Sequence, residues 1–315
     1  MRQRSSILVW LVNLCLVAAI SSGLAFSQKK SAAERLGFPP DSRLLIIHAD
    51  DLGLGHGVNQ ASLTALEKRV ITTGSIMLPC PWFTEVSAYV KGHPDVDLGL
   101  HLTLTSEWKS YRWGPLASRK EVQGLLDPAG YFWKDSPLVV KNARPEEVEL
   151  ELRAQIDTAL RAGIRPTHLD SHMGTLFSPS YFPIYVKLAR EYGLPFLALR
   201  AMTASPALSA HIKEADVFPD ALFMATESLK SEGWIDFYLG VIRSLKPGLS
   251  EIIVHLGNDD AELQAIAEDH PAFGSAWRQR DFNIMTSPEF QNALKENHII
   301  LIGWKEIKKL LATGN

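Results

Sequence analysis

Short runs of apolar residues alternate with segments of helical periodicity along most of the chain. The run at 44–47 is continuous, as is typical of a strand that is buried on both faces. Between such runs, apolar residues three and four positions apart predict helices over 57–68, 145–162 and 179–192. Further strands are predicted at 70–78, 96–104, 167–170, 196–199, 251–255 and 299–302.

This alternation predicts the fold class. Repeated strand–helix units form a mainly parallel sheet with helices outside it, and about seven units favour a closed or nearly closed (β/α) barrel. The turn after the first strand, residues 50–55, lacks the glycine spacing of a dinucleotide-binding loop. We therefore expect one α/β domain over residues 43–315.

The first residues have a different pattern. Arg2 and Arg4 precede an apolar run at 7–20, and small residues follow at 21–25, as in a secretory signal peptide. We expect a signal peptide over 1–27 and a polar linker over 28–42, with no stable membrane insertion after cleavage. A retained membrane anchor is the alternative, although the run is short for a spanning helix. The predicted location is periplasmic or extracellular.

Composition excludes several classes of protein. The chain has 315 residues, 46% of them hydrophobic, and a formal net charge of −3, so it has the composition of a soluble globular protein and no basic surface for nucleic acid. Its only cysteines are Cys15 and Cys80, which rules out a disulfide framework. Cys80 is interpreted as a buried apolar thiol.

A long segment rich in Trp, Gly and Pro, residues 103–136, follows the third predicted strand. Long loops at strand ends often cover active sites. Trp108, Trp113 and Trp133 lie in this loop and are candidates for stacking on sugar rings; anchoring the loop as hydrophobic side chains is the equal alternative.

Four polar clusters end predicted strands, at the edge where catalytic groups of α/β barrels gather. Adjacent carboxylates at such an edge repel one another, and a divalent cation relieves the repulsion. Taken singly, two aspartates can cap a helix, and a histidine in an apolar run can be an ordinary core residue. The clusters are His48-Ala49-Asp50-Asp51, His101, His168-Leu169-Asp170-Ser171-His172, and His255.

Two histidines and a carboxylate are a common ligand set for a catalytic metal ion. Asp51, His101 and His172 provide such a set from three separate strands. Asp50 is then free to act as a general base, and His255 is placed to protonate a leaving amine.

The ordered motifs resemble those of the YdjC-like carbohydrate deacetylases. The resemblance extends from about Leu44 to about Trp304. Any one motif is degenerate, whereas the ordered set is specific. The matching motifs are Ala49-Asp50-Asp51-Leu52-Gly53, Val70-Ile71-Thr72-Thr73-Gly74-Ser75, Gly99-Leu100-His101-Leu102, His168-Leu169-Asp170-Ser171-His172, Val254-His255-Leu256-Gly257 and Ser287-Pro288-Glu289.

This resemblance implies a distorted (β/α) barrel that hydrolyses N-acetyl groups on sugars such as chitooligosaccharides. It implies a divalent metal ion on Asp51, His101 and His172, with Asp50 as the base and His255 as the acid. Arg200 falls where the family often has a basic residue near the substrate. For substrate binding we predict Arg200, Asp170, Trp108 and Trp113.

Two departures from the family pattern concern the substrate. Met173-Gly174-Thr175-Leu176 stands where the family usually has further histidines, and Leu256 replaces the usual proline after His255. The three predicted metal ligands are unaffected. These changes bear on the identity of the sugar rather than on metal binding.

The residues leave other functions open. A metal-dependent ester or phosphate hydrolase is one alternative, although the four clusters contain no Arg or Lys to bind phosphate. A non-catalytic sugar-binding relative is another. The ligand set suits Zn²⁺ and accepts Mg²⁺, Mn²⁺, Co²⁺ or Ni²⁺, and the oligomeric state, homo-oligomers included, is open.

Overall fold

The computed structural model describes residues 30–313, and the chain from Ser31 onward forms one compact unit. The predicted signal peptide lies outside the described residues. The segment predicted as a linker contains the short helix α1, Ala32–Arg35, which the Ser31 hydroxyl caps by accepting a hydrogen bond from the Glu34 backbone N–H. Among the described residues, no helix is long and apolar enough to cross a membrane.

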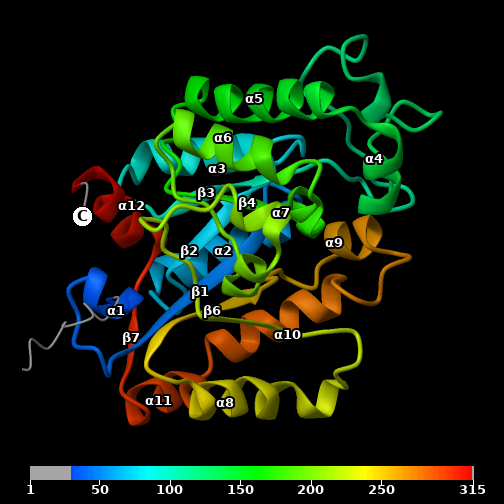
Figure 1. Ribbon diagram of the computed structural model, residues 1–315. Helices are drawn as coiled ribbons and strands as arrows, with labels where there is room; N and C mark the ends of the chain where they lie inside the picture. The colour runs from blue at the N-terminus through cyan, green and yellow to red at the C-terminus, as the bar shows by residue number, and fades with distance from the viewer. Residues whose placement is uncertain (1–29, 314–315) are drawn as a thin grey trace, which may run out of the picture. The chain divides into compact units, whose positions relative to one another are not determined.

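Seven parallel strands form a single curled sheet (Figure 1). Along the sheet their order is β4-β3-β2-β1-β6-β5, and β7 pairs with the first residues of β1. This arrangement confirms the predicted distorted (β/α) barrel with about seven mainly parallel strands. The strands are β1 Arg43–Leu52, β2 Thr73–Ile76, β3 Leu98–Leu102, β4 Leu169–Ser171, β5 Ala221–Met224, β6 Gly248–Val254 and β7 Ile299–Leu301.

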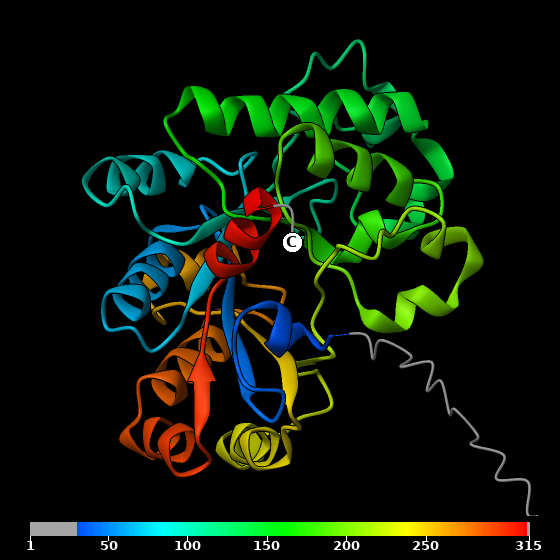
Figure 2. The ribbon, with the colours of Figure 1, turned by 60° about the vertical axis from the view of Figure 1, so that its left-hand side comes forward.

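Helices cover the outside of this sheet (Figure 2). Helices α5 and α6 pack together on the side of β3 and β4, and α8 packs on α11 on the side of β6. The remaining bounds are α2 His56–Glu67, α3 Phe83–Gly92, α4 Ser136–Asn142, α5 Pro145–Arg161, α6 Phe182–Glu191, α7 Pro206–Ser209, α8 Trp234–Ser244, α9 Ala261–Ile266, α10 Ser275–Met285, α11 Pro288–Glu296 and α12 Trp304–Thr313, with 3₁₀ turns at η1 Gln123–Leu125, η2 His172–Phe177, η3 Arg200–Ala204 and η4 Ser231–Gly233.

The strand predicted at 196–199 is reduced to a single bridge between Phe196 and Leu169. Pro195 precedes it and has no N–H to donate, and the turn η3 begins directly after it at Arg200. Strand β5 was not predicted: its four residues, Ala-Leu-Phe-Met, are all half-buried and carry no flanking polar cluster. Segment 196–199 and β5 are thus the two ends of the curled sheet.

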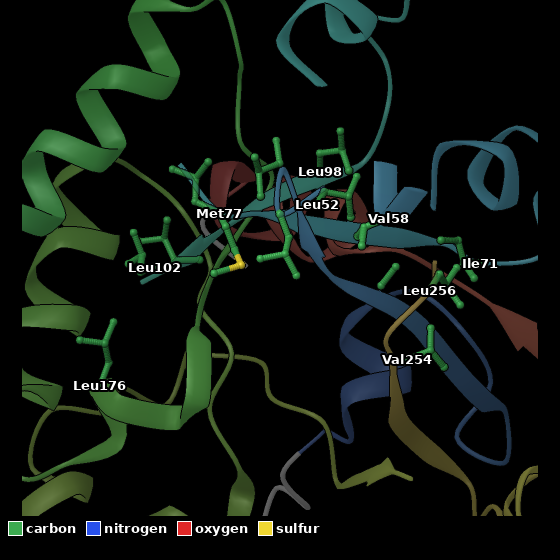
Figure 3. Packing of buried hydrophobic residues seen from close by; sticks show 14 of the residues in the cluster. Leu52, Val58, Ile71, Met77, Leu98, Leu102, Leu176, Val254 and Leu256 are labelled. Atoms are coloured by element: carbon green, nitrogen blue, oxygen red, sulfur yellow. The ribbon is translucent and has the colours of Figure 1, made fainter. Parts of the chain in front are cut away.

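Strand β1 shows why its apolar run is continuous. Leu45 and Ile47 pack against the outer helices in the main core, part of which appears in Figure 3. Leu44 and Ile46 point the other way and join a second cluster inside the barrel with Trp304. Side chains alternate between faces along a strand, so the next inward positions are occupied by the polar residues His48 and Asp50. The inside of the barrel therefore changes from apolar to polar toward the carboxyl ends of the strands.

Candidate active site

The carboxyl ends of β1, β3, β4 and β6 bring residues of all four polar clusters to one cavity of about 530 Å³. Of the residues predicted to bind metal or catalyse, all five line this cavity, and all are buried: Asp50, Asp51, His101, His172 and His255. Residues that are far apart in the sequence meet here because parallel strands share one edge.

The turn after β1 allows two adjacent aspartates to reach the same cavity. Asp51 adopts a left-handed conformation with φ 68°, which aspartate tolerates better than most residues, and the pairing of β1 with β2 is irregular between Ala49 and Leu52. Gly53 follows with φ 94°, where a Cβ would lie 3.0 Å from the carbonyl oxygen of Met77. The backbone N–H of Gly53 donates to Asn59 Oδ1 at 2.7 Å and fixes the start of α2.

Asp51, His101 and His172 converge on one point. Asp51 Oδ1 lies 3.4 Å from His101 Nε2 and 3.4 Å from His172 Nδ1, and this buried oxygen has no hydrogen-bond partner. Two tetrahedral ligands that each lie about 2.1 Å from an ion are separated by roughly 3.4 Å. The three residues therefore fit a divalent metal ion.

Each of these three side chains is held from behind by a charged group. His101 Nδ1 donates to Asp170 Oδ1 at 2.8 Å. His172 Nε2 donates to Glu107 Oε1 at 3.1 Å, and Arg278 Nη2 donates to Asp51 Oδ2 at 2.7 Å. Carboxylates behind ligating histidines fix the ring orientation and direct the free nitrogen toward the ion. This arrangement is what a preorganised metal site requires.

The ionisation of these groups follows from their surroundings. Burial opposes the charge on Asp51, but the Arg278 guanidinium and the neighbouring histidines hold the pKa of Asp51 well below its usual range. Burial also opposes the charge on His172, yet Glu107 and Asp51 raise its pKa to about 10. A metal ion that binds His172 must displace this proton.

His48 lies beneath this cluster and has a different role. Its Nδ1 donates to Glu251 Oε1 at 2.7 Å, and its Nε2 lies 3.2 Å from Asp170 Oδ2. Burial would lower the pKa of His48, but Glu251, Asp50 and Asp170 together raise it to about 10. Its Nδ1 is engaged by Glu251, and the protonated imidazole neutralises part of the negative charge of the surrounding carboxylates.

Asp50 and His255 lie side by side at the edge of the cluster formed by Asp51, His101 and His172. His255 Nε2 is 3.9 Å from Asp50 Oδ2, and Asp50 Oδ2 is 3.8 Å from His101 Nε2. Burial raises the pKa of the Asp50 carboxyl to about 6, and burial lowers the pKa of His255 to about 3. The His255 backbone N–H donates to Asp281 Oδ2 at 3.0 Å, which ties the end of β6 to α10.

The predicted substrate-binding residues have four different placements. Trp108 lines the cavity, whereas Trp113 is buried beside it and its Nε1 donates to the Thr105 carbonyl at 2.7 Å. Asp170 lines the cavity but is occupied by His101. Arg200 does not line the cavity: it is exposed, and its Nε donates to Asp220 Oδ1 at 2.6 Å. Because η3 begins at Arg200, the chain turns this side chain outward.

Two residues that hold the ligand trio in place were not predicted. Glu107 lies in the long loop after β3, and Arg278 lies in α10, 227 residues after its partner Asp51. Neither belongs to a polar cluster at a strand end. Only the position of Glu107 in a loop expected to cover the site gave any indication of it.

Residues 44–296 match the family model described as YdjC-like protein. The chain is 35% identical over 284 residues to a carbohydrate deacetylase of Thermus thermophilus, covering 88% of this chain and 98% of that protein. It is 30% identical to a carbohydrate deacetylase of Geobacillus stearothermophilus, covering 85% and 99%. A crystal structure of a putative cellobiose-phosphate cleavage protein from Enterococcus faecalis has a TM-score of 0.71 and 28% identity, covering 84% and 99%.

Proposed function

Because the chain belongs to the YdjC-like family, we propose that it is a metal-dependent carbohydrate deacetylase that hydrolyses the N-acetyl group of amino sugars or oligosaccharides. The observation that carries the proposal is the trio Asp51, His101 and His172, in which each side chain is held by a charged partner. The relatives described as carbohydrate deacetylases support the reaction class.

Asp51 Oδ1, His101 Nε2 and His172 Nδ1 would hold the ion. A divalent ion there supplies Lewis acidity, which polarises the acyl carbonyl and lowers the pKa of water toward about 7. Zn²⁺ and Mg²⁺ are the metals we favour, with Mn²⁺, Co²⁺ and Ni²⁺ as further candidates.

Asp50 acts as the general base in this proposal. It is buried beside the ligand trio, and Ser75 Oγ donates to its Oδ1 at 3.4 Å. With a pKa of about 6, the carboxylate is ionised at neutral pH and is basic enough to accept a proton from the attacking water. A new C–O bond forms to the acyl carbon as this proton moves to Asp50.

His255 completes the reaction. Burial lowers the pKa of His255 to about 3, so its imidazole is neutral before the reaction starts. It then receives the proton that Asp50, 3.9 Å away, has taken from water. His255 then delivers this proton to the nitrogen while the C–N bond breaks. Acetate and a free amino sugar leave, so the atoms of water are divided between the two products.

The experiment that tests the proposal measures acetate release from a panel of N-acetylated sugars by the purified protein. The assay is run after chelation and again after individual divalent metals are added back. We expect release to stop with the chelator and to return with metal. Folded protein that binds metal but releases no acetate would favour an ester or phosphate hydrolase. Folded protein that binds no metal would contradict the ligand set.

A further inference from the structure

Part of the wall of the cavity is apolar. Its side chains come from segment 196–199, from β5 and from β6. Ile253, the residue from β6, lies two residues before His255 on the same face of the strand. We name this surface the aliphatic wall, and it consists of Leu197, Leu199, Leu222, Met224 and Ile253.

The fold covers this wall only in part. Segment 196–199 and β5 end the curled sheet, and the described backbone pairings include none between them. Deeper in the barrel, Leu44, Ile46 and Trp304 fill the interior, whereas Leu222 and Met224 remain half-buried and border the cavity. An apolar surface inside a cavity gains free energy when an apolar ligand group displaces water from it.

Outside the buried polar side chains of the active site, the exposed and the buried lining residues differ in polarity. Away from the trio, the charged lining residues Lys134 and Glu227 are exposed and lie at the mouth. The most buried members of the aliphatic wall, Leu197 and Ile253, are 4% and 9% exposed. The inner part of this wall therefore offers neither charge nor hydroxyl groups to a ligand.

This division orients an N-acyl amino sugar. Sugar hydroxyls placed against the aliphatic wall would lose hydrogen bonds to water without replacing them, which costs free energy. At the mouth, they meet charged groups and solvent instead. The acyl group is then left on the inner side, and an acetyl methyl, on the order of 30 Å³ in volume, is too small to contact all five side chains of the aliphatic wall.

We infer that the aliphatic wall binds the acyl chain of the substrate and that the enzyme prefers amino sugars carrying N-acyl chains longer than acetyl. The inference rests on the proposed function and keeps its chemistry: water cleaves the same C–N bond, and the products are a fatty carboxylate and the free amino sugar. Each methylene that becomes buried on the wall raises kcat/KM by about fourfold until the space is filled.

The test measures kcat/KM for N-acetyl-, N-butanoyl-, N-hexanoyl- and N-octanoylglucosamine with the metal-loaded protein. Leu222→Trp narrows the space at the aliphatic wall. Phe223→Trp is the matched control, because Phe223 is the next residue of β5 and packs against the main core outside the cavity. We expect kcat/KM to rise with chain length and Leu222→Trp to lower the hexanoyl-to-acetyl ratio at least tenfold. Phe223→Trp should leave this ratio unchanged.

Other outcomes separate the inference from the proposed function. Hydrolysis of the acetyl substrate with no gain for longer chains overturns the inference and leaves the proposed function intact. N-acetylglucosamine carrying an octyl aglycone is the second probe: a gain here without a gain from longer acyl chains assigns the wall to the aglycone and also overturns the inference. Failure to hydrolyse any N-acyl sugar overturns both.

Discussion

The cavity has a polar wall and an aliphatic wall, and the two are held in place by different interactions. On the side of β1, β3 and β4, the residues facing it are charged or polar, and the ligand trio is fixed by Asp170, Glu107 and Arg278. On the side of β5 and segment 196–199, the side chains are aliphatic and make no directional contacts. The polar wall is held by hydrogen bonds between elements far apart in the sequence, whereas the aliphatic wall is formed by apolar side chains that make no such bonds.

The two walls are expected to tolerate amino-acid substitutions to different degrees. A buried charge that loses its partner costs free energy, so a substitution on the polar wall also destabilises the charged residues bonded to the one replaced. Aliphatic side chains of similar volume exchange at smaller cost. We therefore expect the chemistry to depend on the polar wall and the choice of substrate to depend on the aliphatic wall.

The largest effect is expected for Asp51→Asn. The substitution keeps the shape of the side chain but removes the charged ligand oxygen and leaves Arg278 buried without its carboxylate partner. Bound metal should fall below one equivalent, and turnover should drop on the order of 10³-fold or more, because Lewis-acid stabilisation is worth several kcal/mol. Metal analysis of the purified variant beside the assay checks this. Full metal content with normal turnover would remove Asp51 from the ligand set.

Asp50→Asn separates the base from the ligands. We expect kcat to fall about 10²- to 10⁴-fold while metal content stays at the wild-type level. Because the base must be ionised, wild-type activity should rise as the pH increases through the pKa of Asp50, about 6, and the variant should lack this rise. A pH–rate profile of both proteins decides the matter. Unchanged turnover would remove Asp50 from the base role.

These residues were predictable from the sequence for a physical reason. Polar side chains directly after apolar runs lie at the carboxyl ends of strands, and a parallel sheet collects those ends at one edge. Asp50, Asp51 and His101 follow this rule, as do His172 and His255.

What could not be predicted lies outside such patterns. Arg278 reaches Asp51 from the middle of a helix, through tertiary packing that no local spacing encodes. Strand β5 was missed because four half-buried apolar residues have neither the length nor the flanking signals of a buried strand. The aliphatic wall depends on β5, so its position became visible only in the fold.

A smaller effect is expected for Asp170→Asn, which changes the support of the polar wall without removing a ligand. The amide can still accept from His101 Nδ1, but it lacks the charge that orients the ring and neutralises His48. Metal affinity should fall about 10- to 100-fold, as for other carboxylates behind ligating histidines. Competition with a chelator measures the affinity, and excess metal should restore much of the turnover. A loss of turnover that saturating metal does not restore would point to direct contact with substrate.

The smallest effect is expected for Arg200→Ala, although resemblance to the family places a basic residue near the substrate at this position. The Arg200 side chain is 54% exposed and pairs with Asp220 outside the cavity. Such surface pairs contribute about 0–1 kcal/mol to stability. We expect kcat/KM for any N-acyl sugar to stay within about twofold of wild type, because the Arg200 guanidinium does not line the cavity. A loss above tenfold would mean that η3 rearranges when substrate binds, so that the aliphatic wall acquires a cation at its rim.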